Sequence, residues 1–234
     1  KFHDGYNLYN IGFTGGILGT LIAAVLRSFG LIIEIQNVLS EKYSRFLCIM
    51  FSIIFILFII IGYFLDKKRL MEYKNIFKFT GRAPTDFIEL TGSGVTFANM
   101  GTMGLICILY VIVSNGTFNG PIIAGILTAV GFAAYGKHAK NVIPILIGIT
   151  LASNIIIWDT SSTLVIIAGL FGTTLAPVAG EFGLIAGIIT GFLHLSMVMN
   201  VGTIHAGINL YNNGFAGGIV AGIVVPVFRI FKEK

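Results

Sequence analysis

The chain has 234 residues, of which 56% are hydrophobic, and its mean hydropathy is +0.92. Only 11% of the residues are charged, against about 25% in a soluble domain, so a soluble globular protein is excluded. The formal net charge of +5 comes from short basic clusters at the ends of apolar runs, which is the pattern that sets membrane topology rather than one that binds nucleic acid.

The first residues form a glycine-rich motif that occurs again near the C-terminus. Residues 3–17 read HDGYNLYNIGFTGGI and residues 205–219 read HAGINLYNNGFAGGI, with eleven of fifteen positions identical at an offset of 202. A weaker third copy, FANMGTMGLI, occupies residues 97–106. Each copy is a polar turn that opens into an apolar run. In a membrane this pattern favours broken or re-entrant helices of an internally repeated protein.

The offset predicts how the chain divides into units. Residues 1–30 would form the C-terminal end of one repeat unit, and residues 31–234 would form a second unit of about seven membrane segments. Because the sequence begins inside a motif and without an initiator Met, we expect a missing N-terminal repeat of the same protein.

Apolar runs between polar turns predict the membrane segments. A span needs about 20 apolar residues, and several runs are shorter, so half-spanning or tilted helices are expected. The basic segment 66–90 and the turn holding Lys137 and His138 are predicted to be cytoplasmic. Counting spans from that segment, the two strong motif copies run in opposite directions across the membrane only if 162–176 spans fully. The candidate spans are 15–33, 45–65, 100–114, 121–136, 142–157, 162–176, 182–199 and 216–230.

Asparagines of the three copies are the first candidate site residues. An unpaired amide in hydrocarbon costs several kcal/mol, so these side chains must face protein, water or a solute. Two interpretations stay open: the amides line a pathway for a small polar solute, or they satisfy the exposed backbone of broken helices. The residues are Asn7, Asn10, Asn99, Asn209 and Asn212.

Three histidines accompany the motifs. His3 and His205 open the two strong copies, and His194 precedes the second copy by eleven residues. The sequence lacks three or four convergent metal ligands, so neither a metal nor a cofactor is expected. His205 and His194 could tune the polarity of a pathway, although a structural role across the two copies is the competing interpretation.

Aromatic and acidic residues complete the candidate set. Phe97 and Phe215 would narrow the passage, and Glu181 is either a functional carboxylate within the membrane or a helix-capping residue. Ser93, between two glycines, does not form the GxSxG arrangement of a serine hydrolase, so we expect a protein that is not an enzyme.

Longer strings resemble a known family. FNGPIIAGILTAVGFAAYGKHAKNVIP (118–144) and LAPVAGEFGLIAGIITGFLHLSMVMNVGTIHAGINLYNNGF (175–215) resemble the bacterial membrane family called domain of unknown function 1576, which implies membrane location without an activity. GSGVTFANMGTMGLICILYVIV (92–113) is more loosely similar to the pore-helix entry of urea transporters. Met100 replaces an Asn of that pattern and Gly101 replaces a Pro, which puts urea itself in doubt.

The sequence therefore predicts an all-α, polytopic helical membrane protein with internal repeats and re-entrant or broken helices. Its expected function is that of a transporter or channel for a small polar solute in the inner (plasma) membrane. The alternative is a membrane sensor or assembly component whose glycines serve helix packing. The expected partners are the lipid bilayer, the solute, the missing repeat and a possible second copy of the chain, with no nucleic acid.

Overall fold

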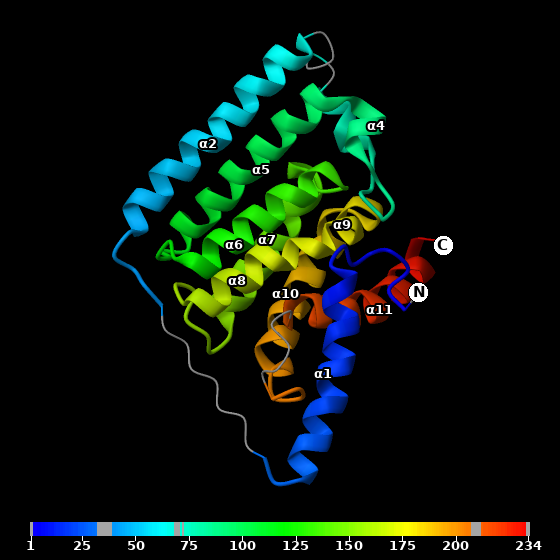
Figure 1. Cartoon of the computed structure of the whole chain (residues 1–234). Helices are drawn as coiled ribbons and strands as arrows, with labels where there is room; N and C mark the ends of the chain where they lie inside the picture. Colours follow the sequence, from blue (N-terminus) through cyan, green and yellow to red (C-terminus); the bar gives the residue numbers. More distant parts are fainter. Residues whose placement is uncertain (1, 32–38, 68–70, 72, 207–211, 233–234) are drawn as a thin grey trace.

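The computed structural model describes residues 2–31, 39–67, 71, 73–206 and 212–232, and over these residues the chain is all-helical (Figure 1). Six helical segments are long and apolar enough to cross a membrane. The elements are α1 (Asn10–Ser28), α2 (Ser44–Leu65), η1 (Tyr73–Lys78), α4 (Phe87–Thr91), α5 (Ser93–Val113), α6 (Gly120–Gly131), η2 (Phe132–Ala134), α7 (Ala139–Ile155), α8 (Thr163–Gly172), η3 (Thr173–Leu175), α9 (Ala176–Phe182), α10 (Leu184–Val201) and α11 (Asn212–Lys232).

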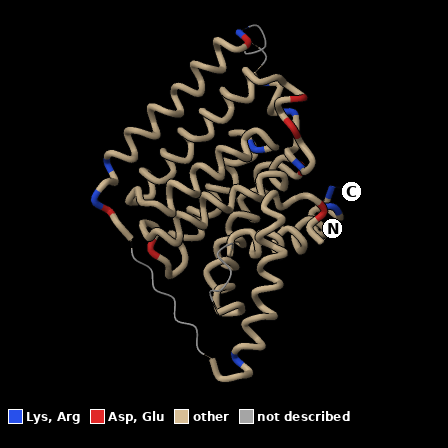
Figure 2. Tube along the Cα trace, in the orientation of Figure 1, with Lys and Arg blue, Asp and Glu red and all other residues tan. Residues whose placement is uncertain are grey.

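Helix starts follow local capping chemistry. Asn119, Ser162 and Asp86 accept hydrogen bonds from backbone N–H groups in the first turns of α6, α8 and α4, which satisfies donors that a helix cannot pair internally. Charged residues gather at the ends of the long apolar helices (Figure 2). This distribution is typical of a protein whose helices lie in a bilayer.

Glycines let the central helices approach closely. A Cβ built on Gly148 of α7 would lie 2.0 Å from the carbonyl oxygen of Ile188, and one on Gly191 of α10 would lie 2.2 Å from that of Ile145. On the outer edge, α2 packs along α5, where Gly104 faces the ring of Phe55 (Figure 1). These glycines serve the small-residue packing that membrane helices use.

The helices α1 and α11, which begin within the two motif copies, pack against each other and run in opposite directions. Equivalent residues contact each other reciprocally: a Cβ on Gly16 would lie 2.2 Å from the Phe215 ring, and a Cβ on Gly218 would lie 2.2 Å from the Phe13 ring. The end of each helix also reaches the loop before the other. Arg27 of α1 donates to the Thr203 carbonyl at 2.7 Å, and Arg229 of α11 bonds the Asp4 carboxylate at 2.5 Å.

Two of the three motif copies show no helix break where the sequence analysis expected one, and the second copy lies partly outside the described residues. The third copy, residues 97–106, lies within the continuous helix α5, and the first copy continues into α1 without a break after Asn10. Interruptions fall instead at η2 and the turn after it, and at η3. The elements α8, η3 and α9 together run from Thr163 to Phe182, and these 20 residues are long and apolar enough to cross a membrane.

Candidate functional site

The break between α8 and α9 is occupied by the first motif copy. Pro177 lacks a backbone N–H, so the helix cannot continue its regular hydrogen bonds through residue Thr173. The extended segment before α1 inserts at this point: Leu8 N–H donates to the Thr174 carbonyl at 3.2 Å, and Tyr9 N–H donates to the Thr174 hydroxyl at 2.8 Å.

Asn7 ties the motif copies to the same break. Its amide NH2 donates to the Gly214 carbonyl at 2.9 Å, and its oxygen accepts from the Thr174 hydroxyl at 2.6 Å and from the Tyr9 N–H at 3.3 Å. All of these groups are buried. Asn7 therefore satisfies backbone and side-chain groups where the helices are interrupted.

A buried lysine lies at the centre of this arrangement. Lys137 follows η2 and is fully buried, although the sequence placed it in a cytoplasmic turn. Its ammonium donates to the Tyr9 phenol oxygen and, at 2.7 Å, to the Thr173 hydroxyl. It also lies 4.4 Å from the centre of the Tyr9 ring and 5.4 Å from that of Phe132, within the range of cation–π attraction.

The partners of Lys137 are neutral. The carboxylates of Asp4 and Glu181 pair with Arg82, Arg229 and Lys232 instead. Lys137 belongs to the turn between η2 and α7 and to neither helix. Because this ammonium is buried with no carboxylate beside it, its pKa is lowered to about 7. The group can therefore be charged or neutral near physiological pH.

The polar segment after η1 closes over this turn. Asn141 donates to the carbonyls of Thr80 and Gly136 at 3.2 Å and 2.9 Å, and the ring Nε2 of His138 donates to the Phe79 carbonyl at 2.9 Å. His138 was expected in a cytoplasmic loop, but it is buried and begins α7 with a reciprocal capping box. Part of segment 66–90 thus packs on the helices.

Asn99 fixes the same turn from the α5 side. Its amide NH2 donates at 2.7 Å to the carbonyls of both Ala133 and Lys137, and its oxygen accepts from the Tyr73 hydroxyl at 3.2 Å. The side chain is fully buried. Asn99 was a candidate for solute contact, and the structure gives its hydrogen bonds to the chain itself.

A cavity of about 520 Å³ lies beside the buried lysine. We call it the motif cavity, because it is lined by Leu8–Ile11 of the first copy and by Asn213 and Gly214 of the second, with residues of α6, η2 and α8 completing the wall. Tyr9 and Phe132, whose rings face the Lys137 ammonium, belong to its lining.

Two histidines orient the asparagine amides of this cavity. His3 Nε2 donates to Asn10 Oδ1 at 2.8 Å, and His194 Nε2 donates to Asn213 Oδ1 at 3.1 Å. Since an amide oxygen can only accept, each ring carries its hydrogen on Nε2. The oxygen of each amide is thereby occupied, and its NH2 group is the part left for the cavity.

A second cavity of about 480 Å³ adjoins the first. We call it the α4 cavity, since it is lined by residues 83–86 before α4 and by Glu89 and Tyr135. Leu8 and Phe132 line both cavities and so stand between them. Asp86 caps α4, with its carboxylate accepting from the N–H groups of Ile88 and Glu89.

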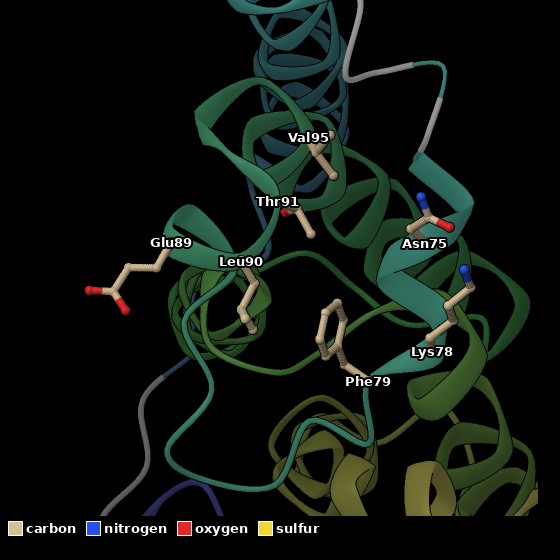
Figure 3. A pocket seen from close by; sticks show the side chains of 7 residues that line it. All are labelled: Asn75, Lys78, Phe79, Glu89, Leu90, Thr91 and Val95. Atoms are coloured by element: carbon tan, nitrogen blue, oxygen red, sulfur yellow. The ribbon is translucent and has the colours of Figure 1, made fainter.

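A third hollow of about 390 Å³ lies between η1 and α4 (Figure 3). Phe79 and Leu90 face each other across it, whereas the carboxylate of Glu89 points away from the other lining residues and Lys78 lies on the opposite side. The hollow therefore brings no opposite charges together around a ligand.

The remaining candidates are dispersed. His205 is fully buried beside Phe215, and within the described residues neither of its ring nitrogens has a hydrogen-bond partner, nor has the buried Oδ1 of Asn212 at the start of α11. Phe97 stacks edge-on with Phe58 of α2, away from the motif cavity. Glu181 lies in the last turn of α9 and pairs with Lys232 rather than capping a helix start. Asn209 lies outside the described residues.

The sequence analysis did not single out Lys137, Thr173 and Tyr9, whose side chains the structure brings together. A lysine beside His138 and Lys140 reads as part of a cytoplasmic cluster, and only the fold shows that its turn is covered by residues 79–83. The signal that could have found Thr173 and Thr174 was present: two hydroxyl residues precede a proline inside an apolar run.

Comparison with protein families matches the chain over residues 1–28 and 65–230 to the family described as "Protein of unknown function (DUF1576)". The chain belongs to the DUF1576 family. Neither the search of curated proteins nor that of solved structures gave a match. The matched residues of the DUF1576 model include both motif copies, the Lys137 turn and the η3 break, whereas α2 lies outside the match almost entirely.

Proposed function

We propose that this DUF1576 protein is a transporter or channel for a small polar solute. The supporting observation is the motif cavity, which lies where two antiparallel helices, a helix break and a buried lysine meet. Interrupted helices with polar groups beside a cavity are how membrane proteins bind solutes, because irregular backbone is tolerated there only against protein or water.

The cavity next to the motif cavity supports the same proposal. The α4 cavity adjoins it through Leu8 and Phe132, and it is bordered by the polar segment 83–89. We propose that the solute passes between the two cavities when these side chains move. The chemistry requires no covalent step, and the residues involved bind and orient the solute only.

Flux measurement on proteoliposomes tests this function. The purified protein is challenged with a panel of small neutral and ionic solutes, and entry is followed by stopped-flow light scattering. Saturable flux above that of protein-free liposomes is expected for at least one class of solute. Folded protein without flux for any class would overturn transport and leave the sensor or assembly role.

A blocking substitution links flux to the motif cavity. Ala124 of α6 lines the cavity, so the bulky ring of Ala124→Trp should fill part of it and abolish flux. Leu127 lies on the same helix, is 45% exposed and does not line either cavity, so Leu127→Trp is the matched control and should retain flux. Equal flux from both variants would remove the motif cavity from the route.

A further inference from the structure

The motif cavity offers hydrogen-bond donors to whatever enters it. The oxygens of Asn10 and Asn213 are held by His3 and His194, so the amide NH2 groups remain, and neither donates to another described residue. The hydroxyl hydrogen of Thr128 is used on the Ala124 carbonyl. A cationic solute would find few acceptors here, whereas an anion accepts from several donors.

The start of α1 adds donors of the same kind. Tyr9, in the N-cap position, makes no side-chain capping bond, and no described residue accepts from the N–H groups of Asn10 and Ile11. Both residues line the cavity. Unsatisfied N–H groups and the positive end of the helix dipole favour an anionic group at this position.

The buried ammonium supplies the matching charge. Lys137 lies behind the aromatic wall that Tyr9 and Phe132 present to the cavity, and its bonded partners Tyr9 and Thr173 carry no negative charge. A buried charge without a counterion is costly, and an anion on the other side of the Tyr9 ring would reduce that cost.

The rest of the cavity is apolar. Ile11, Ile167 and Phe171 line it together with Ala124, and its volume of about 520 Å³ is larger than a simple inorganic ion requires. The lining therefore combines one donor-rich end with a hydrocarbon wall. A ligand that fits both parts has a charged acceptor group and an apolar body.

We infer that the motif cavity binds an organic monocarboxylate, with the carboxylate on the Asn10 and Asn213 amides and the start of α1, and with the hydrocarbon body against Ile167 and Phe171. This inference rests on the proposed function and names its substrate class. The carboxylate comes either from a small water-soluble acid or from a fatty acid of the bilayer, since the recognising groups are the same.

The test measures binding separately from flux. Radiolabelled hexanoate and, in a parallel series, radiolabelled palmitate are equilibrated by dialysis with the full chain in detergent, and unlabelled hexanoate, hexanamide, hexylammonium and palmitate compete with the labelled hexanoate. Hexanoate is expected to bind saturably and to be displaced far better by itself than by hexanamide or hexylammonium. Equal displacement by hexanamide, or no saturable binding of either hexanoate or palmitate, would overturn the inference. Palmitate binding alone would assign the carboxylate to the lipid phase.

Asn213→Asp provides the discriminating variant. The new carboxylate keeps an oxygen for His194 but replaces the NH2 donor with a negative oxygen, so the dissociation constant for hexanoate should rise by about tenfold or more. Asn154→Asp makes the same change at an exposed site on α7 and should leave binding unchanged. Unaltered binding in a folded Asn213→Asp protein would contradict the assigned pose.

Flux and binding then separate the two proposals. Hexanoate binding without hexanoate flux would overturn transport and leave the carboxylate site. Flux of neutral solutes by a protein that does not bind hexanoate would support transport and overturn the carboxylate site.

Discussion

At the residue scale, the asparagines differ in burial and in hydrogen bonding: Asn7 and Asn99 are buried, whereas Asn10 is exposed and Asn213 is half-buried. The Asn99 NH2 donates two hydrogen bonds to the chain and the Asn7 NH2 donates one, and the oxygens of both side chains accept hydrogen bonds. The NH2 groups of Asn10 and Asn213 donate to no other described residue. Substitutions at the two pairs should therefore have different consequences, one for stability and one for binding.

Asn99→Ala is expected to destabilise the protein. The substitution leaves the buried carbonyls of Ala133 and Lys137 without their donor, and each unsatisfied group costs about 1–3 kcal/mol. Thermal unfolding in detergent should show a clearly lower midpoint than for Asn154→Ala, which removes an exposed amide. A midpoint equal to that of this control would show that the Asn99 amide does not hold the turn.

Hexanoate binding should weaken as pH rises through about 7. Lys137 is charged below its pKa, which burial lowers to about 7, so its attraction for an anion is present at lower pH and lost above it. The nearby phenol of Tyr9 and thiol of Cys107 ordinarily titrate at higher pH, and burial lowers the pKa of the adjacent His138 to about 4, so these groups keep their charge state between pH 6 and 8.

The expected change over that interval is about tenfold in affinity, because the charged fraction of a group with this pKa falls by about that factor. Lys137→Met should bind weakly at both pH values and lose the pH dependence. Dialysis with labelled hexanoate at pH 6 and pH 8 measures both effects. A pH profile in Lys137→Met identical to that of the natural chain would assign the titration to another group.

At the element scale, the α1–α11 pair depends on glycines that face aromatic rings. Each of the two helices contributes one glycine and one phenylalanine to the same kind of contact, Gly16 with Phe215 and Gly218 with Phe13. A close contact at this point sets the position of Asn10 and Asn213, which lie in the first turns of the two helices and line the motif cavity. Packing between the helices therefore determines cavity geometry.

Gly16→Ala and Gly218→Ala should destabilise the protein to a similar extent. In each case the added methyl group would lie 2.2 Å from a phenylalanine ring carbon, and relieving such overlap typically costs about 1–3 kcal/mol. Gly131→Ala in α6 is the matched control, since nothing lies within 4 Å of its added Cβ and alanine favours a helix. The measurement is the thermal midpoint of each of the three variants in detergent. If Gly16→Ala and Gly218→Ala unfold at the same midpoint as Gly131→Ala, the close packing is contradicted.

At the scale of the whole molecule, the helix order places connections alternately on two sides. The chain between Lys78 and Ser161 passes through α5, α6 and α7, and the turns around these two residues lie at opposite ends of these helices (Figure 1). Basic residues concentrate around Lys78. By the positive-inside rule we expect the Lys78 side in the cytoplasm. A cysteine at Ser161 should react with a membrane-impermeant maleimide in intact cells, and one at Lys78 only after permeabilisation, with Cys48 and Cys107 replaced by alanine. Reaction of both in intact cells would contradict this topology.

Most spans were predictable from the sequence, because an apolar run long enough to cross a bilayer has few alternatives. The predicted span 216–230 corresponds to α11 (Asn212–Lys232), and 45–65 to α2 (Ser44–Leu65). The candidate site was harder to predict from the sequence. Lys137 looks like a surface residue beside Lys140, and its burial depends on contacts with Tyr9 and Thr173, which are far away in the chain. Such long-range contacts leave no local pattern.

The antiparallel pair also limits how the protein can move. Gly12 and Gly214 touch at the crossing, Arg27 holds one end of the pair through the Thr203 carbonyl, and Arg229 holds the other through Asp4. Two helices that are held together at their crossing and at both ends are not expected to bend relative to each other. If the motif cavity opens and closes, we therefore expect the wall formed by α6 and α8 to move more than the α1–α11 pair.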